Sequence, residues 1–133
     1  NGTDENDRKI IGRLLKAAGT AFEVPEKQLD AITGLSGSGP AYFARFIEWL
    51  SYAGEQEGLD PDVATALTVQ TALGTAKLIQ QLGITPGDVV DIVSSPGGTT
   101  VAGRLVLESG AVKNVIECTV AAAAARSREL GKI

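Results

Sequence analysis

The sequence predicts an all-α protein built as a helical bundle, and two observations carry this prediction. Apolar residues recur at helical spacing through most of the chain, with capping residues, prolines and glycines where helices would begin and end. Aromatic residues are scarce, at 5% of the 133 residues, whereas alanine and glycine abound, which favours closely packed helices. A chain of this length is expected to form one domain.

The N-terminal region is predicted to hold one amphipathic helix and one strand. The helix covers residues 4–18, with Thr3 or Asp4 as its cap. The stretch from Thr20 to Val24 has the composition of a short strand, and a short helix follows over residues 26–35. Because a lone strand needs a partner, this one is expected either to pair between two chains or to belong to a sheet outside this sequence.

Three helices are predicted in the middle of the chain, over residues 40–57, 61–82 and 86–93. The turn Ser36–Gly39 leads into the first of them, and Asp60 caps the second. That second helix is apolar on nearly every face, which predicts that it is buried on most faces.

Two more helices are predicted over residues 99–108 and 112–130. The last one contains five consecutive alanines, Ala121–Ala125, which fit two interpretations equally well. They can reflect simple helix propensity, or they can mark a close contact between helices, including one across a dimer. Cys118 lies within the apolar pattern of this helix and is expected to be a buried, inert thiol.

Charge and composition exclude several classes of function. The net charge is −4 and no basic patch is visible, so no nucleic-acid partner is expected. The chain has no histidine and one cysteine, which rules out a Ser–His–Asp triad and predicts no metal site. A single cysteine, no signal peptide and no apolar run of membrane length predict a cytoplasmic protein with no membrane partner. The first residue is Asn1 rather than methionine, which indicates a fragment.

A glycine-rich loop, Ser94–Thr100, lies ahead of a predicted helix. Gly97 and Gly98 permit unusual dihedral angles and close approach of a ligand, and the first N–H groups of a helix lack internal partners. Such a loop can bind a small carboxylate or phosphate, although the spacing alone favours an ordinary helix cap. The phosphate-loop pattern is absent, and Ser36–Gly39 is not a dinucleotide-binding turn, because Tyr42 stands where the third glycine belongs.

Several blocks of the sequence closely resemble the C-terminal half of pyrroline-5-carboxylate reductase, in the order and spacing of that family. The likeness covers essentially the whole chain and continues into "VAAAAARSREL", and Ser-Pro-Gly-Gly-Thr-Thr is specific in this context. The blocks are "DAITGLSGSGPAY" (Asp30 to Tyr42), "QTALGTAKL" (Gln70 to Leu78), "VSSPGGTTVAG" (Val93 to Gly103) and "LESGAVKNVI" (Leu107 to Ile116).

The resemblance implies part of an enzyme that reduces the C=N bond of 1-pyrroline-5-carboxylate to give L-proline, with hydride from NADPH or NADH. Residues 1–28 would be a remnant of an N-terminal Rossmann domain, and residues 29–133 would form the helical dimerisation and substrate-binding domain. In the family the helical domains interlock into a homodimer, and dimers often assemble further. The cofactor-binding residues are unknown here, because the glycine-rich nucleotide turn is missing from this sequence, so no cofactor is expected on this chain alone.

The resemblance also implies the site residues. Backbone N–H groups at Gly98, Thr99 and Thr100 would hold the substrate carboxylate, and Gly97 belongs to the same substrate-binding loop. Ser95 would order the loop or contact the carboxylate. Thr100 is the candidate catalytic residue, because its hydroxyl would face the ring nitrogen as a hydrogen-bond donor or proton relay.

One departure from the family pattern and two alternative functions remain open. Trp49, Ser51 and Tyr52 replace smaller or acidic residues of the family, which leaves the local packing of the dimer open. The isolated chain is predicted to lack reductase activity. It could instead be a stand-alone dimerisation module without catalytic duty, which would have no need of the intact loop. It could also be a small-carboxylate binding protein, but its site would then be open on the cofactor side and poorly desolvated.

Overall fold

The computed structural model describes residues 4–132, and the predicted all-α fold is confirmed there. The chain forms seven α-helices, one short 3-10 helix (η1) and one π-helix (η2) within these residues. In chain order they are α1 (Glu5–Ala18), η1 (Glu26–Gln28), α2 (Leu29–Ile32), η2 (Thr33–Gly37), α3 (Gly39–Gln56), α4 (Pro61–Leu82), α5 (Pro86–Val93), α6 (Thr99–Ser109) and α7 (Val112–Leu130).

Local capping signals place the helix ends where the sequence predicts them. Asp4 caps α1 by accepting the backbone N–H of Asp7 at 2.8 Å, while the other predicted candidate, Thr3, lies outside the described residues. Asp60 caps α4 in the same way, and Gly83, with φ 63°, ends that helix in the left-handed conformation. Each cap satisfies backbone groups that the helix itself leaves without partners.

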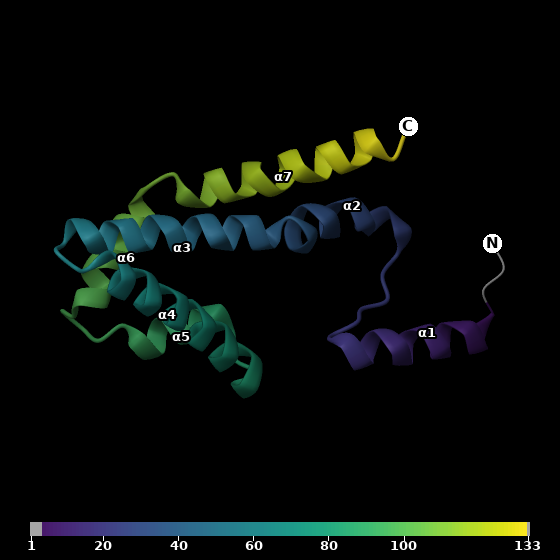
Figure 1. Ribbon diagram of the computed structural model, residues 1–133, viewed down its shortest axis with the longest axis horizontal. Helices are drawn as coiled ribbons and strands as arrows, with labels where there is room; N and C mark the ends of the chain where they lie inside the picture. Colours follow the sequence, from purple (N-terminus) through teal and green to yellow (C-terminus); the bar gives the residue numbers. More distant parts are fainter. Residues whose placement is uncertain (1–3, 133) are drawn as a thin grey trace.

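The predicted strand from Thr20 to Val24 is wrong for this chain. These residues form a connection without regular structure, and no strand occurs anywhere in the part of the chain that the structure describes. A strand is held by hydrogen bonds to a neighbouring strand, and the described residues offer none. The connection leaves α1 standing apart from the other helices (Figure 1).

The predicted turn over Ser36–Gly39 is also wrong, because the chain passes through the π-helix η2 and runs directly from α2 into α3. The hydroxyl groups of Thr33, Ser36 and Ser38 donate to backbone carbonyls four or five residues earlier in the chain. Side-chain hydroxyls therefore supplement the backbone hydrogen bonds through this widened turn.

Helix α7 lies along α2 and η2, and α4 packs on α3 (Figure 1). Ala124 of α7 is buried, and a methyl group added to Gly34 would lie 2.9 Å from its backbone nitrogen. The Ser127 hydroxyl also donates to the Asp30 carboxylate at 2.7 Å across the same contact. The alanine run therefore includes a close helix–helix contact within one chain, which was one of the two predicted interpretations.

The core of the single chain is very small. Its buried hydrophobic residues within the described part are only Ala64, Val89 and Ala124. The prediction that the second helix of the middle region is buried on most faces is wrong for the chain alone, since α4 leaves large apolar side chains exposed. Each of its neighbours covers only one side of it. The exposed α4 residues include Val63, Leu67, Val69 and Leu73.

The accessible surface measures how much of the chain is uncovered. It amounts to 10703 Å², whereas a compact folded monomer of 13.7 kDa exposes about 6,600 Å². The predicted burial of Cys118 is wrong for the same reason, because its face of α7 is left open.

Within residues 4–132, no helix is long and apolar enough to cross a membrane.

Candidate functional site

The glycine-rich loop forms a tight turn between α5 and α6. Gly98 donates its backbone N–H to the carbonyl oxygen of Ser95 at 2.9 Å, and Gly97 has a φ of 72°. Proline at the second position of a turn and a glycine with positive φ at the third are the residues that a type II turn requires. The sequence Ser-Pro-Gly-Gly therefore supplies the residues that this type of turn requires.

Gly98 is the N-cap residue of α6, and no side chain caps this helix. The first turn of α6 therefore presents backbone N–H groups that have no partner within the helix, including those of Thr99 and Thr100. The N–H of Gly98 differs from them, because the turn already uses it. A Cβ on Gly98 would lie 3.0 Å from the Ser95 carbonyl oxygen, so the turn favours glycine at this position.

The structure brings all the predicted loop residues to one end of α6. Gly98 is half-buried, and Ser95, Gly97, Thr99 and Thr100 are exposed. Free N–H groups, the positive end of the helix dipole and two threonine hydroxyls therefore meet at an accessible surface. Such an arrangement can bind a small anion.

Arg104 is a candidate that the sequence reasoning missed. It lies four residues after Thr100, which places both on one face of α6. Its Nε atom is buried without a hydrogen-bond partner among the described residues, and it lies 3.7 Å from the Glu108 carboxylate. Ser94, just before the turn, likewise has a buried Oγ atom without a partner in that part of the chain. The signal in the sequence was an arginine one helical turn beyond the loop.

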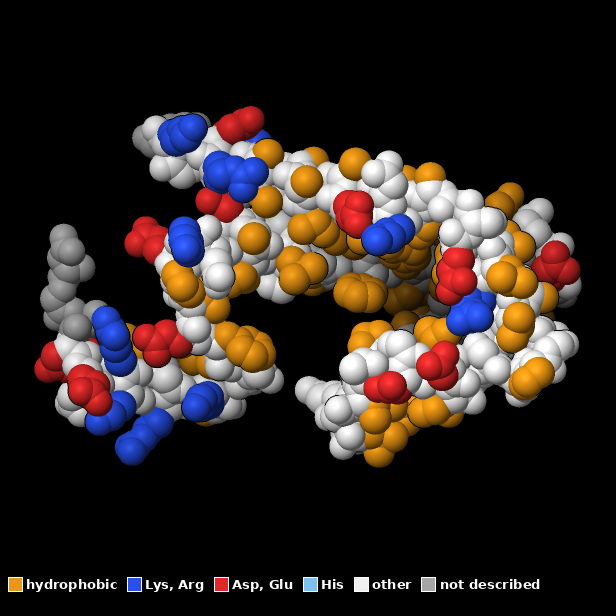
Figure 2. All heavy atoms as spheres, turned by 180° about the vertical axis from the view of Figure 1, so that it is seen from behind, with side chains coloured by type: hydrophobic (Ala, Val, Ile, Leu, Met, Phe, Trp, Pro, Cys, Tyr) orange, Lys and Arg blue, Asp and Glu red, His pale blue; other side chains and the backbone are white. Residues whose placement is uncertain are grey.

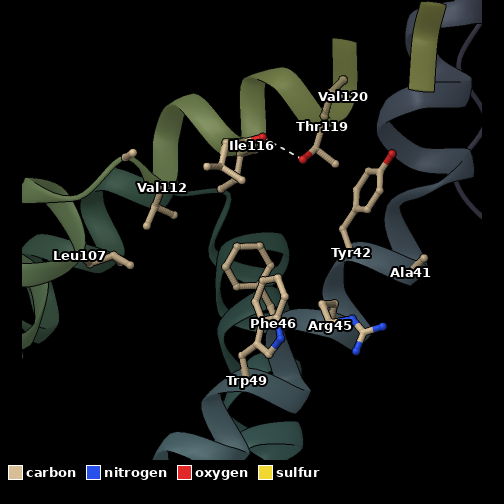
Figure 3. A pocket seen from close by; sticks show the side chains of 12 residues that line it. Ala41, Tyr42, Arg45, Phe46, Trp49, Leu107, Val112, Ile116, Thr119 and Val120 are labelled. Carbon is tan, nitrogen blue, oxygen red and sulfur yellow. Dashed lines mark hydrogen bonds between the residues drawn. The ribbon is translucent and has the colours of Figure 1, made fainter. Parts of the chain in front are cut away.

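A second feature is an apolar groove of about 640 Å³ between α3 and the segment formed by α6 and α7. Figure 3 shows side chains of α3 on one wall and those of α6 and α7 on the other. Its only charged lining residue is Arg45, which forms an ion pair with Glu48 on the same helix. We call this feature the α3–α7 groove; it is lined by Ala41, Tyr42, Arg45, Phe46, Trp49, Leu107, Ala111, Val112, Val115, Ile116, Thr119 and Val120.

The described residues contain no strand–turn–helix unit of the kind that binds dinucleotides in a Rossmann domain. Such a unit needs a strand that runs through a glycine-rich turn into a helix, and no strand occurs within residues 4–132. The glycines of Ser36–Gly39 lie in η2 and at the start of α3.

Comparison with known families and proteins gives consistent matches. A family profile described as "Pyrroline-5-carboxylate reductase dimerisation" matches residues 26–130. The pyrroline-5-carboxylate reductase of Glycine max is 47% identical over 126 residues, which cover 95% of this chain and 46% of that protein. The enzyme of the same name from Synechocystis is 49% identical over 119 residues, covering 90% and 45% of the two chains. The chain thus spans about half the length of these curated relatives.

Solved structures resemble this fold closely. A pyrroline-5-carboxylate reductase from Coxiella burnetii matches with a TM-score of 0.91 and 36% identity, over 96% of this chain and 48% of that one. A pyrroline carboxylate reductase from Plasmodium falciparum, solved with NADP bound, matches with a TM-score of 0.87 and 31% identity, over 98% of this chain and 50% of that one.

Proposed function

The chain belongs to the pyrroline-5-carboxylate reductase family, and from that premise we propose that it is the dimerisation and substrate-binding part of such an enzyme. The reaction would reduce the C=N bond of 1-pyrroline-5-carboxylate to L-proline. The single observation that carries the proposal is the Ser-Pro-Gly-Gly-Thr-Thr turn, which opens into the uncapped first turn of α6. The domain would comprise residues 29–133, and the family profile begins nearby, at residue 26.

The carboxylate of the substrate would be held at the start of α6. Thr99 and Thr100 would donate their backbone N–H groups to it, supported by the positive end of the helix dipole. Gly97 and Gly98 would shape the loop, and Ser95 would order it through the carbonyl oxygen that accepts the Gly98 N–H. We assign no direct carboxylate contact to the Gly98 N–H, because the turn already occupies it.

The Thr100 hydroxyl would act on the ring nitrogen. When the C=N bond is reduced, the carbon takes a hydride and the nitrogen takes or keeps a proton, so a hydroxyl at this nitrogen can orient it and relay a proton. The hydride would come from NADPH or NADH, bound by residues outside those described here. The contribution of this chain is to fix the orientation of the ring and to compensate its charge.

Homodimerisation is the second part of the proposed function. The surface exposed by the single chain exceeds that of a compact monomer by roughly 4,000 Å². Obligate homodimers bury about 2,000–5,000 Å² in total, or roughly 1,000–2,500 Å² on each chain, so a second copy can cover part of this excess, while other residues of a longer chain would cover α1. A stand-alone dimerisation module is the second candidate function, which this exposed surface also favours.

A chimaera tests the proposal. In it, this chain replaces the matching half of the Synechocystis enzyme, to which it is 49% identical, and proline formation is measured with both nucleotides. We expect an active chimaera, and no activity for the isolated chain. Thr100→Val should lower activity by about 10²-fold or more, in line with the loss of a group that acts in proton transfer.

Thr20→Val is the matched control, because Thr20 lies in the connection after α1, which is at the opposite end of the molecule from the loop between α5 and α6 (Figure 1). It should leave the activity of the chimaera unchanged. A folded, dimeric chimaera in which Thr100→Val has full activity would remove Thr100 from the mechanism. A folded chimaera that lacks activity with either nucleotide would instead favour the stand-alone module.

A further inference from the structure

The single tryptophan of the chain, Trp49, lies exposed in the α3–α7 groove. Trp49 as a whole residue is 58% exposed. The ring meets that of Phe46 edge to face, with centroids 6.0 Å apart and an interplanar angle of 69°. Figure 3 shows the two rings together on the α3 side of the groove. The described residues thus hold the indole through one aromatic neighbour and leave more than half of Trp49 uncovered.

The chemistry of the groove selects an apolar occupant. Leu107, Val112 and Ile116 line the wall that faces α3 (Figure 3). The charge of Arg45 is compensated by its ion pair with Glu48. Hydrophobic side chains gather in the hollow between the rod of α3 and α7 and the lobe formed by α4, α5 and α6 (Figure 2). A charged partner would find no complementary charge on these walls.

The size of the uncovered surface, together with the match to a dimerisation profile, favours a second copy of this chain as the occupant. Each chain of an obligate homodimer buries roughly 1,000–2,500 Å², so the excess of roughly 4,000 Å² over a compact monomer leaves ample surface for such an interface. The chain also carries apolar helix faces that such a groove could receive, since Leu67 and Leu73 on α4 and Val106 on α6 are exposed. In a twofold dimer each surface covers its counterpart on the other copy.

We propose that Trp49 is the anchor of the homodimer, buried against an apolar helix of the second copy within the α3–α7 groove. This inference rests on the homodimer of the proposed function and deepens it by naming the residue that dominates the interface. Tryptophans surrounded by a rim that excludes water are the commonest residues to dominate such interfaces.

The first test uses the unaltered chain, because Trp49 is its only tryptophan. Indole fluorescence and its quenching by acrylamide are measured on samples whose mass is determined by sedimentation equilibrium, with N-acetyltryptophanamide as the exposed reference. We expect blue-shifted emission and weak quenching in the dimer. On dilution below the dissociation constant, both properties should move toward those of the reference.

The second test uses three variants. Trp49→Ala should raise the dissociation constant of the dimer at least about 30-fold, which is the change expected at a residue that dominates an interface. Trp49→Phe, which keeps an aromatic ring, should show a smaller rise. Phe22→Ala removes another large exposed ring, 81% exposed and outside the groove, and should leave the constant unchanged.

The possible results separate this inference from the function on which it rests. A dimer in which Trp49 is quenched as readily as the reference would overturn the inference and leave the homodimer standing. A Trp49→Ala variant that dimerises as tightly as the unaltered chain would do the same. A chain that remains monomeric at every concentration would overturn both.

Discussion

Gly34 of η2 faces α7 so closely that a methyl group on it would lie 2.8 Å from the carbonyl oxygen of Val120. Real Cβ atoms essentially never approach a backbone atom to such a distance. The hydrogen that Gly34 carries in place of a side chain is therefore what lets the two helical segments meet. The Ser127–Asp30 hydrogen bond spans the same contact.

Gly34→Ala is expected to destabilise the fold by about 1–3 kcal/mol, the usual cost of forcing an extra carbon into a close-packed contact. Gly37→Ala in the same π-helix is the control, because its Cβ would meet only the Thr33 methyl group, at an ordinary 3.8 Å. Urea unfolding at one fixed chain concentration measures both. Equal stabilities for the two variants would mean that the close approach of Gly34 to α7 does not contribute to the stability of the fold.

Gly97→Ala tests the turn at the proposed substrate site. Gly97 has a φ of 72°, a conformation that costs an alanine roughly 1–2 kcal/mol. We expect lower stability and, in the chimaera, weaker substrate binding. Gly103→Ala within α6 is the control, because a Cβ there meets open space and alanine favours the helix. If Gly97→Ala leaves substrate binding intact, the geometry of the turn is not what holds the carboxylate.

We expect Asp88 to make the stability of α5 depend on pH. Hydrogen bonds from the Thr85 hydroxyl and backbone N–H lower the pKa of Asp88 below its ordinary 3.8. A lowered pKa means that the ionised carboxylate stabilises the folded state above the unfolded value. This contribution is lost as the pH falls through the lower folded value.

Asp88→Asn should therefore be less stable than the unaltered chain at pH 7, and the difference should shrink below about pH 4. Asp91→Asn, in the last turn of the same helix, is the control and should show no loss at pH 7. Thermal unfolding followed by circular dichroism between pH 3 and 7 measures both. A difference that stays constant across this range would exclude the carboxylate as the source of the stabilisation.

The features that could be predicted from the sequence are those that depend on a few neighbouring residues. Asp60 caps α4 by accepting N–H groups two and three residues ahead, and Gly83 ends it through its own backbone conformation. The glycines and proline of the loop specify their turn in the same local way. Such signals need no knowledge of the rest of the fold.

The features that could not be predicted depend on what lies across space. Cys118 and Leu67 have apolar neighbours in the sequence, but the described residues leave both of them exposed. The stretch from Thr20 to Val24 has the composition of a strand without a partner. The close approach at Gly34 depends on α7, about ninety residues further along, and the sequence pattern there reads as a simple turn.

The most direct test of the account is sedimentation equilibrium across a dilution series, with circular dichroism on the same samples. We predict a dimer of twice 13.7 kDa that persists at low concentration. Helical signal and dimer should disappear together, because a chain with so small a core depends on its partner to stay folded. A monomer of 13.7 kDa that keeps its full helical signal at every concentration would contradict the account.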